Sequence, residues 1–366
     1  GEDAEMGKSA VKGLFYICLI AATFVLATIT IMAAFSGNVA PVDSVIMPLL
    51  GLAVPVLLIV NLITALCWAL ARKRWALIPL VAFFCNWGYL TSVFQLNLPK
   101  DKTPAGKYLK IATYNIHNFG GEITGYSCKE IARYMQQEGV DVLCFQEFGD
   151  NSDFPTDSIR RVLSHWSHAL IPSEDSVKGV LPIAVFSRYP LANHRFITYQ
   201  HSSNCSMMCD VVMGTDTIRL INNHLQTTSV SQKRRKWERE LATDDTRREV
   251  QAAKDAAGTL HENFMKRATQ TYVISHYAKT SPYPVLLCGD FNSIPSSYTY
   301  HHLRKTLKDG FRTAGNGYMY TYRYAKRMLR IDYIFHSPSL KGIAYYSPDL
   351  DLCSDHNPVI MEVEIQ

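Results

Sequence analysis

The sequence predicts an α/β domain preceded by three transmembrane helices, and two observations lead to this expectation. The first 98 of the 366 residues contain three long apolar runs with few charges between them. From residue 108 the pattern changes to short apolar strands that alternate with polar loops and helical stretches. The formal net charge of +5 is too small to indicate a nucleic-acid partner by itself. A chain of this length accommodates more than one structural unit.

The apolar runs predict transmembrane helices at residues 13–35, 45–71 and 75–96. Each run reaches the roughly 20 residues that a membrane-spanning helix needs. A cleaved signal peptide is the alternative for the first run, but that run is long and two further runs follow it. Three buried helices of a soluble protein are the other alternative. The three spans define an N-terminal membrane domain at residues 1–98.

The distribution of lysine and arginine predicts the orientation of these helices. Lys8 and Lys12 precede the first run and ARKRW, at 71–75, joins the second run to the third, whereas the connector SGNVAPVDS contains neither lysine nor arginine. We therefore expect an integral membrane protein with a cytoplasmic N-terminus and an extracytoplasmic second domain, in the periplasm or outside the cell. Four lysines close to the third run weaken this expectation: Lys100, Lys102, Lys107 and Lys110.

The second domain is expected at residues 108–366, after a linker at 99–107. Residues 127–138 and 231–279 are predicted helices. Strands interspersed with helices predict α/β layers around mixed sheets. Seven short apolar segments bounded by polar residues are the predicted strands: 108–116, 140–148, 181–190, 217–226, 285–292, 329–337 and 357–365.

The first part of the long helical region, residues 231–254, is densely charged. One interpretation is that its cations dock on anionic lipid. The other is a solvated helix with charges of mixed sign, which the acidic residues that follow favour. The residues in question are Lys233, Arg234, Arg235, Lys236 and the neighbouring Trp237.

The nine cysteines form no metal-binding pattern. The sequence contains no CxxC pair and no Cys/His spacing typical of zinc, so a structural zinc site is not expected. Cys144 and Cys288 lie in predicted strands and are expected to be buried as small hydrophobic residues. Cys205 and Cys209 are interpreted as part of a polar loop, SSNCSMMCD, and a disulfide between them is left open.

Polar residues recur where the predicted strands end, which is where α/β folds commonly place their sites. In VLLCGDFNSIP, at 285–295, an apolar strand runs into Asp290 and Asn292, whose side chains would share one face of an extended chain. A turn is the alternative for this pair, because Asp and Asn beside Pro commonly form one. The other strand-end residues are Asn115, Glu147, His224, Asp332, Asp355 and His356.

This set of side chains favours a hydrolase that uses a hard metal ion. Carboxylate and amide oxygens are the ligands that Mg²⁺ and Mn²⁺ prefer, and histidine transfers protons near neutral pH. No nucleophilic serine or cysteine motif is evident beside them. We therefore expect Mg²⁺ as the cofactor, with Mn²⁺ or another divalent cation as the alternative. His117, two residues after Asn115, is interpreted as a surface residue.

The chain resembles the endonuclease/exonuclease/phosphatase superfamily in seven motifs that occur in the family's order: TYNIHNF, FQEF, FSRYP, NNHLQ, GDFNSIP, RIDYIF and SDHNP. Members of that superfamily include deoxyribonucleases, abasic-site endonucleases, inositol-phosphate 5-phosphatases and neutral sphingomyelinases. The resemblance covers about residues 108–366 and leaves the apolar N-terminal runs outside it. It implies a four-layer α/β sandwich, in which two mixed sheets pack face to face with helices outside.

The same resemblance implies which residues bind metal. Glu147 would be the main metal ligand, with Asn115 beside it. Asp355 would bind the same metal or a second ion.

It also implies catalytic roles for five residues. His356 resembles the general base that takes a proton from the attacking water, and Asp332 resembles the carboxylate that orients it. Asp290 and Asn292 would orient the nucleophile and bind a phosphate oxygen. His224 resembles the second histidine of the family, which stabilises the charge of the phosphorane-like state or assists the leaving group.

The resemblance does not define one substrate. NNHLQ resembles the motif of sphingomyelinase-like members more than that of abasic-site endonucleases, and a membrane anchor would keep the site near lipid head groups. We therefore expect a membrane-anchored phosphodiester hydrolase that cleaves phospholipid or sphingolipid head groups by attack of water on phosphorus. The alternatives are an extracytoplasmic nuclease, a phosphomonoesterase and a non-catalytic receptor for phosphorylated ligands.

Overall fold

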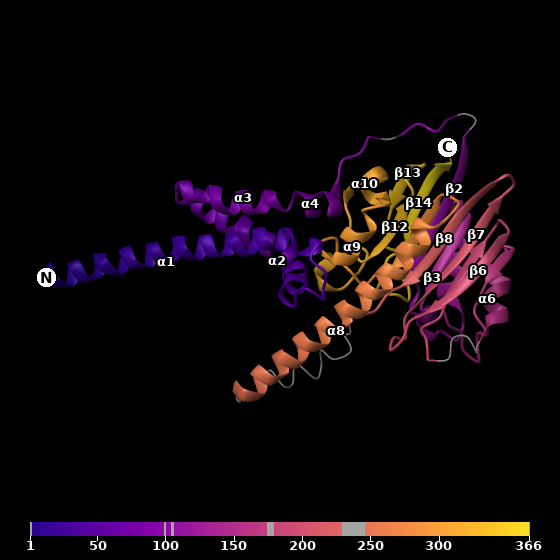
Figure 1. Cartoon of the computed structure of the whole chain (residues 1–366), viewed down its shortest axis with the longest axis horizontal. Coiled ribbons are helices and arrows are strands. Elements are labelled where there is room, and N and C mark those ends of the chain that lie inside the picture. Colours follow the sequence, from indigo (N-terminus) through magenta and orange to yellow (C-terminus); the bar gives the residue numbers. More distant parts are fainter. Residues whose placement is uncertain (1, 99, 104–105, 174–178, 229–245, 366) are drawn as a thin grey trace. The chain divides into compact units, whose positions relative to one another are not determined.

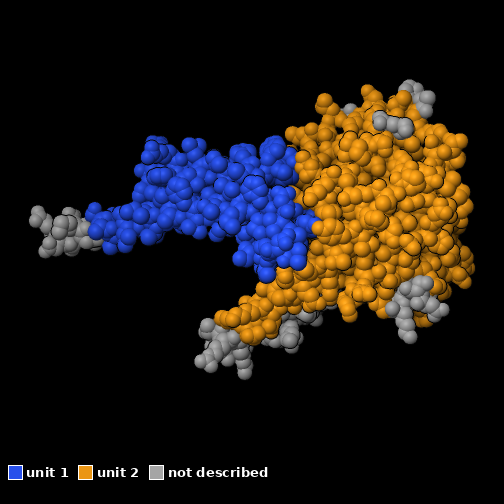
Figure 2. Space-filling view, in the orientation of Figure 1, with its two compact units in different colours: residues 1–91, 296–298 blue, residues 92–295, 299–366 orange. Residues whose placement is uncertain are grey.

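The computed structural model describes residues 2–98, 100–103, 106–173, 179–228 and 246–365. The chain divides into two compact units, one of residues 1–91 with 296–298 and one of residues 92–295 with 299–366 (Figure 2). The domain boundaries expected from the sequence, at residues 98 and 108, stay a prediction.

The first unit consists of helices. The long ones are α1 (Glu2–Ala34) and α2 (Ile46–Leu70), followed by the shorter α3 (Leu77–Cys85) and α4 (Trp87–Val93). Two helical stretches, Ser9–Asn38 and Ile46–Leu70, are long and apolar enough to cross a membrane. The first two predicted spans are therefore helices of the required length and composition.

The third predicted span is not one continuous helix. α3 and α4 are bent by 63° at a break that contains Asn86. The buried Asn86 Nδ2 donates to the carbonyl oxygens of Ala82, four residues earlier, and of Thr30 on α1, both at 3.1 Å. A side chain that occupies the carbonyl four residues earlier competes with the helical hydrogen bond there. The described helices thus provide two spans, or three if the bent pair crosses as one broken span.

Polar side chains join the helices of this unit. Asn61 Nδ2 on α2 donates to Thr30 Oγ1 on α1 at 2.7 Å, and Trp68 Nε1 donates to Thr23 Oγ1 at 2.9 Å. Hydrogen bonds of this kind hold helices together where the surrounding medium is as apolar as the side chains.

The second unit contains two six-stranded mixed sheets (Figure 1). The first has the order β10–β12–β9–β8–β7–β6, with β6 (Leu191–Thr198), β7 (Cys205–Met213), β8 (Asp216–His224), β9 (Val285–Asp290), β10 (Lys308–Asp309) and β12 (Asp332–His336). The second has the order β13–β14–β2–β3–β5–β4, with β2 (Lys107–Asn115), β3 (Val142–Gln146), β4 (His168–Leu170), β5 (Ile183–Ser187), β13 (Leu340–Tyr346) and β14 (Val359–Ile365). β2 is parallel to β3 and β8 is parallel to β9, and the other pairs in these sheets are antiparallel.

The helices of this unit cover the outer faces of the sheets. α5 (Tyr126–Gln137) and α6 (Thr156–Val162) pack on the second sheet, and α8 (Thr246–Lys279) and α9 (Tyr298–Leu303) pack on the first. The remaining elements of this unit are short: α10 (Gly310–Ala314), the strand pair β1 (Phe94–Gln95) with β11 (Gly317–Tyr318), and the 3-10 turns η3 (His117–Gly121) and η5 (Ala325–Arg327). The 3-10 turns η1 (Ser36–Asn38) and η2 (Arg74–Ala76) belong to the first unit.

Alternation along β3 shows why these strands read as continuous apolar runs. Val142 and Cys144 face the core between the two sheets, whereas Leu143 and Phe145 face the core under α5 and α6. Successive side chains of a strand point to opposite faces, so a strand that is buried on both sides is apolar throughout. The α/β fold with two packed mixed sheets flanked by helices is therefore confirmed.

The interpretation of SSNCSMMCD as a polar loop holds only for residues 202–204 and is wrong for residues 205–210, which belong to β7. Cys205 and Cys209 are buried on strand β7, and both are free cysteines. Four residues of strand separate them by about 13 Å, well beyond the reach of a disulfide. The charged cluster at 233–237 lies outside the described residues, and α8 accounts for residues 246–279 of the predicted helical region.

Candidate active site

The two parallel strand pairs bring polar residues to one edge of the sheets. β2 ends at Asn115, and Glu147 directly follows β3. β8 ends at His224 and β9 ends at Asp290, and these two residues are partners in the strand register. Asp332 begins β12, which runs antiparallel to β9, and is the partner of Asp290 on its other side. Pairing of the strands therefore assembles side chains that are far apart in the sequence.

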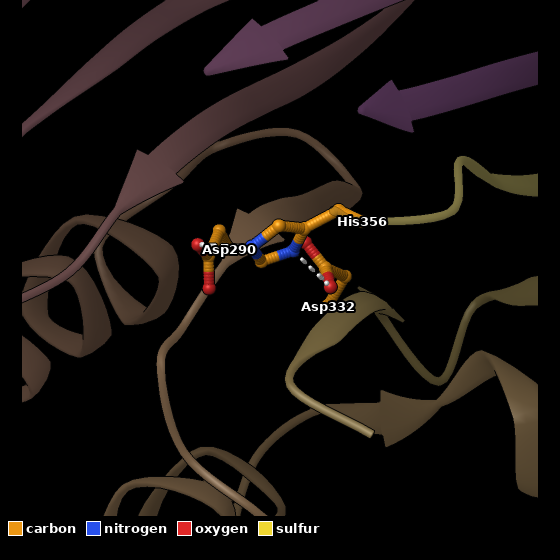
Figure 3. A group of neighbouring side chains, drawn as sticks. All are labelled: Asp290, Asp332 and His356. Carbon is orange, nitrogen blue, oxygen red and sulfur yellow. Dashed lines mark hydrogen bonds and ion pairs between the residues drawn. The ribbon is translucent and has the colours of Figure 1, made fainter. Parts of the chain in front are cut away.

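A buried histidine lies between two carboxylates at this edge (Figure 3). His356 Nδ1 is 2.9 Å from Asp332 Oδ2, and His356 Nε2 is 3.8 Å from Asp290 Oδ2. Donor atoms of the three side chains lie within 4.8 Å of one another, close enough to hold a metal ion. The first hydrogen bond orients the imidazole with Nε2 directed towards Asp290.

Asp290 also joins His356 and Asp332 to a second cluster, the Glu147 cluster, which consists of Asn115, Glu147 and His224. Asn115 Nδ2 donates to Asp290 Oδ2 at 3.1 Å and to Glu147 Oε1 at 3.2 Å. His224 Nε2 lies 3.7 Å from both Glu147 Oε1 and Asp290 Oδ2. His117 is mostly exposed, yet its Nδ1 lies 3.2 Å from Glu147 Oε2. The amide nitrogen of Asn115, rather than its oxygen, therefore faces the carboxylates.

Asp355 lies at the margin of the site. Its Oδ1 is 3.9 Å from His356 Nε2, and its side chain is partly exposed. Together with the two clusters, this contact places seven of the eight residues singled out in the sequence at one edge of the sheets.

The eighth residue, Asn292, departs from the expected geometry. β9 ends at Asp290, and Asn292 has a left-handed backbone with φ of +47°. Its backbone N–H donates to Asp290 Oδ1 at 2.8 Å, and its Nδ2 donates to the Leu225 carbonyl at 3.0 Å. The expectation that both side chains project from one face of an extended chain is wrong, because the chain turns after Asp290. Asp290 accepts the turn hydrogen bond with one oxygen and faces the site with the other.

The carboxylates and the burial shift the pKa values of both histidines. Burial alone would lower the pKa of His356, but Asp332 and Asp290 outweigh it and raise that pKa to about 10. Burial raises the pKa of Asp332 to about 6, against the opposing pull of His356. The two groups interact strongly, so each shift depends on the protonation of the other group. Burial lowers the pKa of His224, against the opposing effects of Asp290 and Glu147.

The backbone around the site has positive φ at several further residues, among them Glu147 and Gly289. Glu147 has φ of +48°, a left-handed value that is uncommon for residues other than Gly. Gly289 has φ of +133°, and a Cβ placed there would lie 1.9 Å from the Asn223 carbonyl oxygen. Strained residues of this kind persist where the surrounding structure holds them, often at functional sites.

Two further contacts of the site were missed from the sequence. Ser354 Oγ accepts a hydrogen bond from the His356 backbone N–H at 3.0 Å and donates to the Asn115 carbonyl at 2.5 Å. The ring centroid of Tyr322 is 5.2 Å from that of His356, and burial together with the nearby Asp355 carboxylate raises the pKa of Tyr322 to about 12. The signals were present in the serine of SDHNP and in the alternating tyrosines of residues 318–324.

The donor chemistry of the site fits a hard divalent cation. Carboxylate oxygens from separate strands converge there, and Asp332 Oδ1 is buried without a hydrogen-bond partner in the described part of the chain. His224 Nδ1 is likewise buried and unpartnered within those ranges. Buried polar atoms ordinarily have partners, so the unpartnered Asp332 Oδ1 fits a site that binds a further group.

The sequence matches two family models. Residues 112–356 match the Endonuclease/Exonuclease/phosphatase family, and residues 14–93 match a Domain of unknown function (DUF8431). A comparison with curated proteins gave no match.

Several solved structures are similar to the chain at low sequence identity. An endonuclease/exonuclease/phosphatase from Beutenbergia cavernae is 17% identical with a TM-score of 0.50, covering 71% of this chain and 72% of its own. TDP2 from C. elegans is 16% identical with a TM-score of 0.51, covering 71% and 75%. D. rerio TDP2 complexed with single strand DNA product is 14% identical with a TM-score of 0.50, covering 70% and 99%. At these identities the likeness establishes a shared fold.

Proposed function

Because the chain belongs to the endonuclease/exonuclease/phosphatase family, whose enzymes use divalent metal ions to hydrolyse phosphoester bonds, we propose that it is a membrane-anchored phosphodiesterase. The observation that carries this proposal is the arrangement of His356, oriented by Asp332 and directed at Asp290, beside the Glu147 cluster. Water would attack phosphorus at this point without a covalent intermediate on the protein.

His356 would act as the general base. Its Nδ1 is held by Asp332, so Nε2 is the atom that takes the proton of the attacking water. Asp332 then stabilises the imidazolium that forms, as the carboxylate does in other His–Asp pairs.

Asp290 and His224 would orient the reactants. Asp290 Oδ2, which also accepts from Asn115 Nδ2, lies beside Nε2 of both histidines, where it can accept a hydrogen bond from the attacking water. The lowered pKa of His224 keeps it a neutral donor, suited to a phosphate oxygen or to the leaving group. Asn292 would contact phosphate through its side-chain oxygen, since its nitrogen is bonded to Leu225.

The metal would be held by the carboxylates of this edge, with Glu147 and Asp290 as the central pair and Asp355 at the margin. A bound divalent cation supplies charge neutralisation on the non-bridging phosphate oxygens and offsets the effect of the carboxylates on the His356 proton. Mg²⁺ is the cation we propose, with Mn²⁺ as the alternative.

Lipid head groups are the substrate class that we propose first. Support comes from the two apolar helices that precede the site in the same chain, because tethering raises the effective concentration of a membrane-bound substrate. Phospholipids and sphingolipids both offer the required phosphodiester.

Single-stranded nucleic acid is the second candidate, and a different observation favours it. Tyrosines alternate at 318, 320, 322 and 324, and the centroids of Tyr322 and Tyr324 lie 5.7 Å apart beside His356. The Arg327 guanidinium lies 5.7 Å from the centroid of Tyr320. Aromatic rings with cations are the features on which unstacked bases bind.

The test is an assay of the full chain in lipid nanodiscs. Sphingomyelin, phosphatidylcholine, phosphatidylinositol and single-stranded DNA are presented separately with Mg²⁺, with Mn²⁺ or with EDTA. We expect head-group release that requires the cation. Cleavage of DNA alone would favour the second candidate, and absence of hydrolysis of every phosphodiester would overturn both.

A further inference from the structure

Arg267 on α8 is a buried cation next to the site. Its side chain is 2% exposed. Nε donates to the Gln226 carbonyl at 2.8 Å, and Nη1 donates to Ser293 Oγ at 3.2 Å. Nη2 is also buried and has no hydrogen-bond partner within the described ranges of the chain. The Arg267 guanidinium on α8 therefore joins two separate segments of the chain, one at Gln226 and one at Ser293.

The two segments carry catalytic residues of the proposed mechanism. Gln226 lies two residues after His224, and Ser293 directly follows Asn292, three residues after Asp290. These segments also contact each other, because the Leu225 backbone N–H donates to the Asp290 carbonyl at 2.9 Å. Arg267 thus lies behind the point where the ends of β8 and β9 meet.

Gln226 is held by two further residues of the same helix face. Its backbone N–H donates to Gln270 Oε1 at 2.7 Å, and its Nε2 donates to Asn263 Oδ1 at 3.2 Å. Asn263, Arg267 and Gln270 are spaced by four and three residues, which places them on one side of a helix. One face of α8 therefore binds Gln226, which directly follows His224 and Leu225.

The charge of Arg267 is unusual for a structural residue. None of its partners in the described part of the chain is a carboxylate within ion-pair distance, whereas buried charges are ordinarily paired. Burial lowers the pKa of Arg267 to about 10, opposed by the charge of Asp290, so the guanidinium remains protonated at neutral pH. A leucine or methionine would fill this space without that desolvation cost.

We propose that Arg267 is a positioning residue, whose two-donor fork holds the His224–Gln226 segment against the Asp290–Ser293 segment. The inference rests on the proposed function for its catalytic consequence, but its structural part stands independently of the substrate. The competing explanation is that Arg267 only stabilises the packing of α8 on the sheet.

The experiment compares three variants of the full chain in detergent. Arg267→Met removes the fork and the charge, and Arg267→Lys keeps the charge but offers one nitrogen in place of two. Thr271→Val is the matched control, because Thr271 is buried on the same helix and its hydroxyl bonds the Arg267 backbone carbonyl and Thr299 on α9, not the guanidinium fork. Hydrogen exchange is measured at the amides of residues 225, 226 and 292, and kcat and KM are measured below the unfolding midpoint of every variant.

We expect faster exchange at these three amides in both Arg267 variants and wild-type exchange in Thr271→Val. We expect kcat to fall roughly 10- to 100-fold in Arg267→Met, the range typical of residues that orient a metal or catalytic group, with KM changed less than about threefold. Arg267→Lys should stay at least about tenfold below wild type.

Wild-type exchange at these amides, full recovery of kcat by lysine, or a loss of kcat no larger than in Thr271→Val would each overturn the inference. If the wild-type protein hydrolyses no phosphodiester, the proposed function fails, and the exchange measurement still decides whether Arg267 holds the two segments.

Discussion

Asp290 is the residue on which the site depends most. One oxygen accepts the Asn292 N–H, and the other accepts Asn115 Nδ2 while lying within 4 Å of Nε2 of His224 and His356. The Asp290 carboxylate therefore lies between the Glu147 cluster and the His356–Asp332 pair and contacts both. An asparagine at this position would keep the shape but remove the charge that both histidines face.

Removal of the base or of the main carboxylate tests the proposed chemistry. We expect His356→Ala and Glu147→Ala each to lower kcat by at least roughly 100-fold, because general base catalysis and metal binding are lost separately. Far-UV circular dichroism should show a folded protein in both cases. His194→Ala, an exposed position on the edge strand β6, is the control and should keep wild-type kcat. Retained activity in either site variant would remove the role assigned to that residue.

Gly289 tests the close approach of β8 and β9. In Gly289→Ala the Cβ would lie 1.9 Å from the Asn223 carbonyl oxygen, so the two strand ends must separate beside His224 and Asp290. We expect a loss of roughly 1–3 kcal/mol in the free energy of unfolding and a larger fractional loss of kcat. Gly214→Ala is the control, because it too has positive φ, of +67°, but no atom lies near its Cβ position. An equal kcat in the two variants would contradict this account.

At the scale of elements, the sequence predicted seven of the twelve strands in the two sheets, and β4, β6, β7, β10 and β13 were not predicted. All seven predicted strands coincide with strands of the two sheets, with ends that differ by a few residues. β7 was missed because Ser206 and Asp210 interrupt its apolar residues. Both are buried through partners on β8, Ser206 by Asn223 and Asp210 by Arg219. A local pattern does not reveal such partners, since they depend on which strands become neighbours.

The same limit applies to the site. The strand-end rule identified Asn115 and Asp290, yet the hydrogen bond between them joins residues 175 positions apart. Arg267 and Tyr322 could not be singled out, because nothing in their local sequence distinguishes them from packing or surface residues. Their roles become visible only through what the fold places beside them.

The buried ion pair between β10 and the start of β12 gives a prediction at this scale. Asp309 and Arg330 are both 0% exposed, and two hydrogen bonds of 2.6 and 2.7 Å join them. Arg330→Met would leave Asp309 buried and unpaired, which costs about 3–5 kcal/mol in the free energy of unfolding. Chemical unfolding at pH 7 measures this loss, and Arg188→Met, at the partly exposed pair with Asp141, is the control and should lose less than about 1 kcal/mol.

This pair also predicts a dependence of stability on pH. Burial alone would raise the pKa of Asp309, but Arg330 outweighs it and holds that pKa below its ordinary 3.8. A depressed carboxyl pKa contributes stability that is present above the unfolded value and lost as the pH falls through the folded value. Wild-type protein should therefore lose stability below about pH 4. The difference in unfolding free energy between wild type and Arg330→Met should narrow there, and an unchanged difference at pH 3 would contradict the ion-pair account.

For the whole molecule, the number of membrane crossings decides on which side the second unit lies. An odd number places it opposite the N-terminus, and an even number places both on the same side. The bent pair, Arg74–Cys85 with Trp87–Val93, would cover about 30 Å if it were straight, which equals the roughly 30 Å of hydrocarbon, and the 63° bend shortens this reach. The bent pair is therefore the element on which the topology depends.

We expect three crossings, with the second unit outside the cytoplasm. Protease added to intact cells or right-side-out vesicles should digest this unit, whereas a reporter fused before residue 8 should be protected. Protection of the second unit would make α3 and α4 a re-entrant pair and place the site in the cytoplasm. Detergent lysis before protease treatment controls for intrinsic resistance to cleavage.

β14 lies between β13 and β2 in its sheet. The last strand of this sheet in the sequence therefore pairs with the first one, β2. During synthesis, β2 must wait for about 250 further residues before its second neighbour exists. His356, on the segment that leads into β14, arrives at the same stage. The apolar N-terminal helices therefore emerge from the ribosome long before the edge that carries His356 can form. That edge is complete only when the last strand of the sheet has paired with β2.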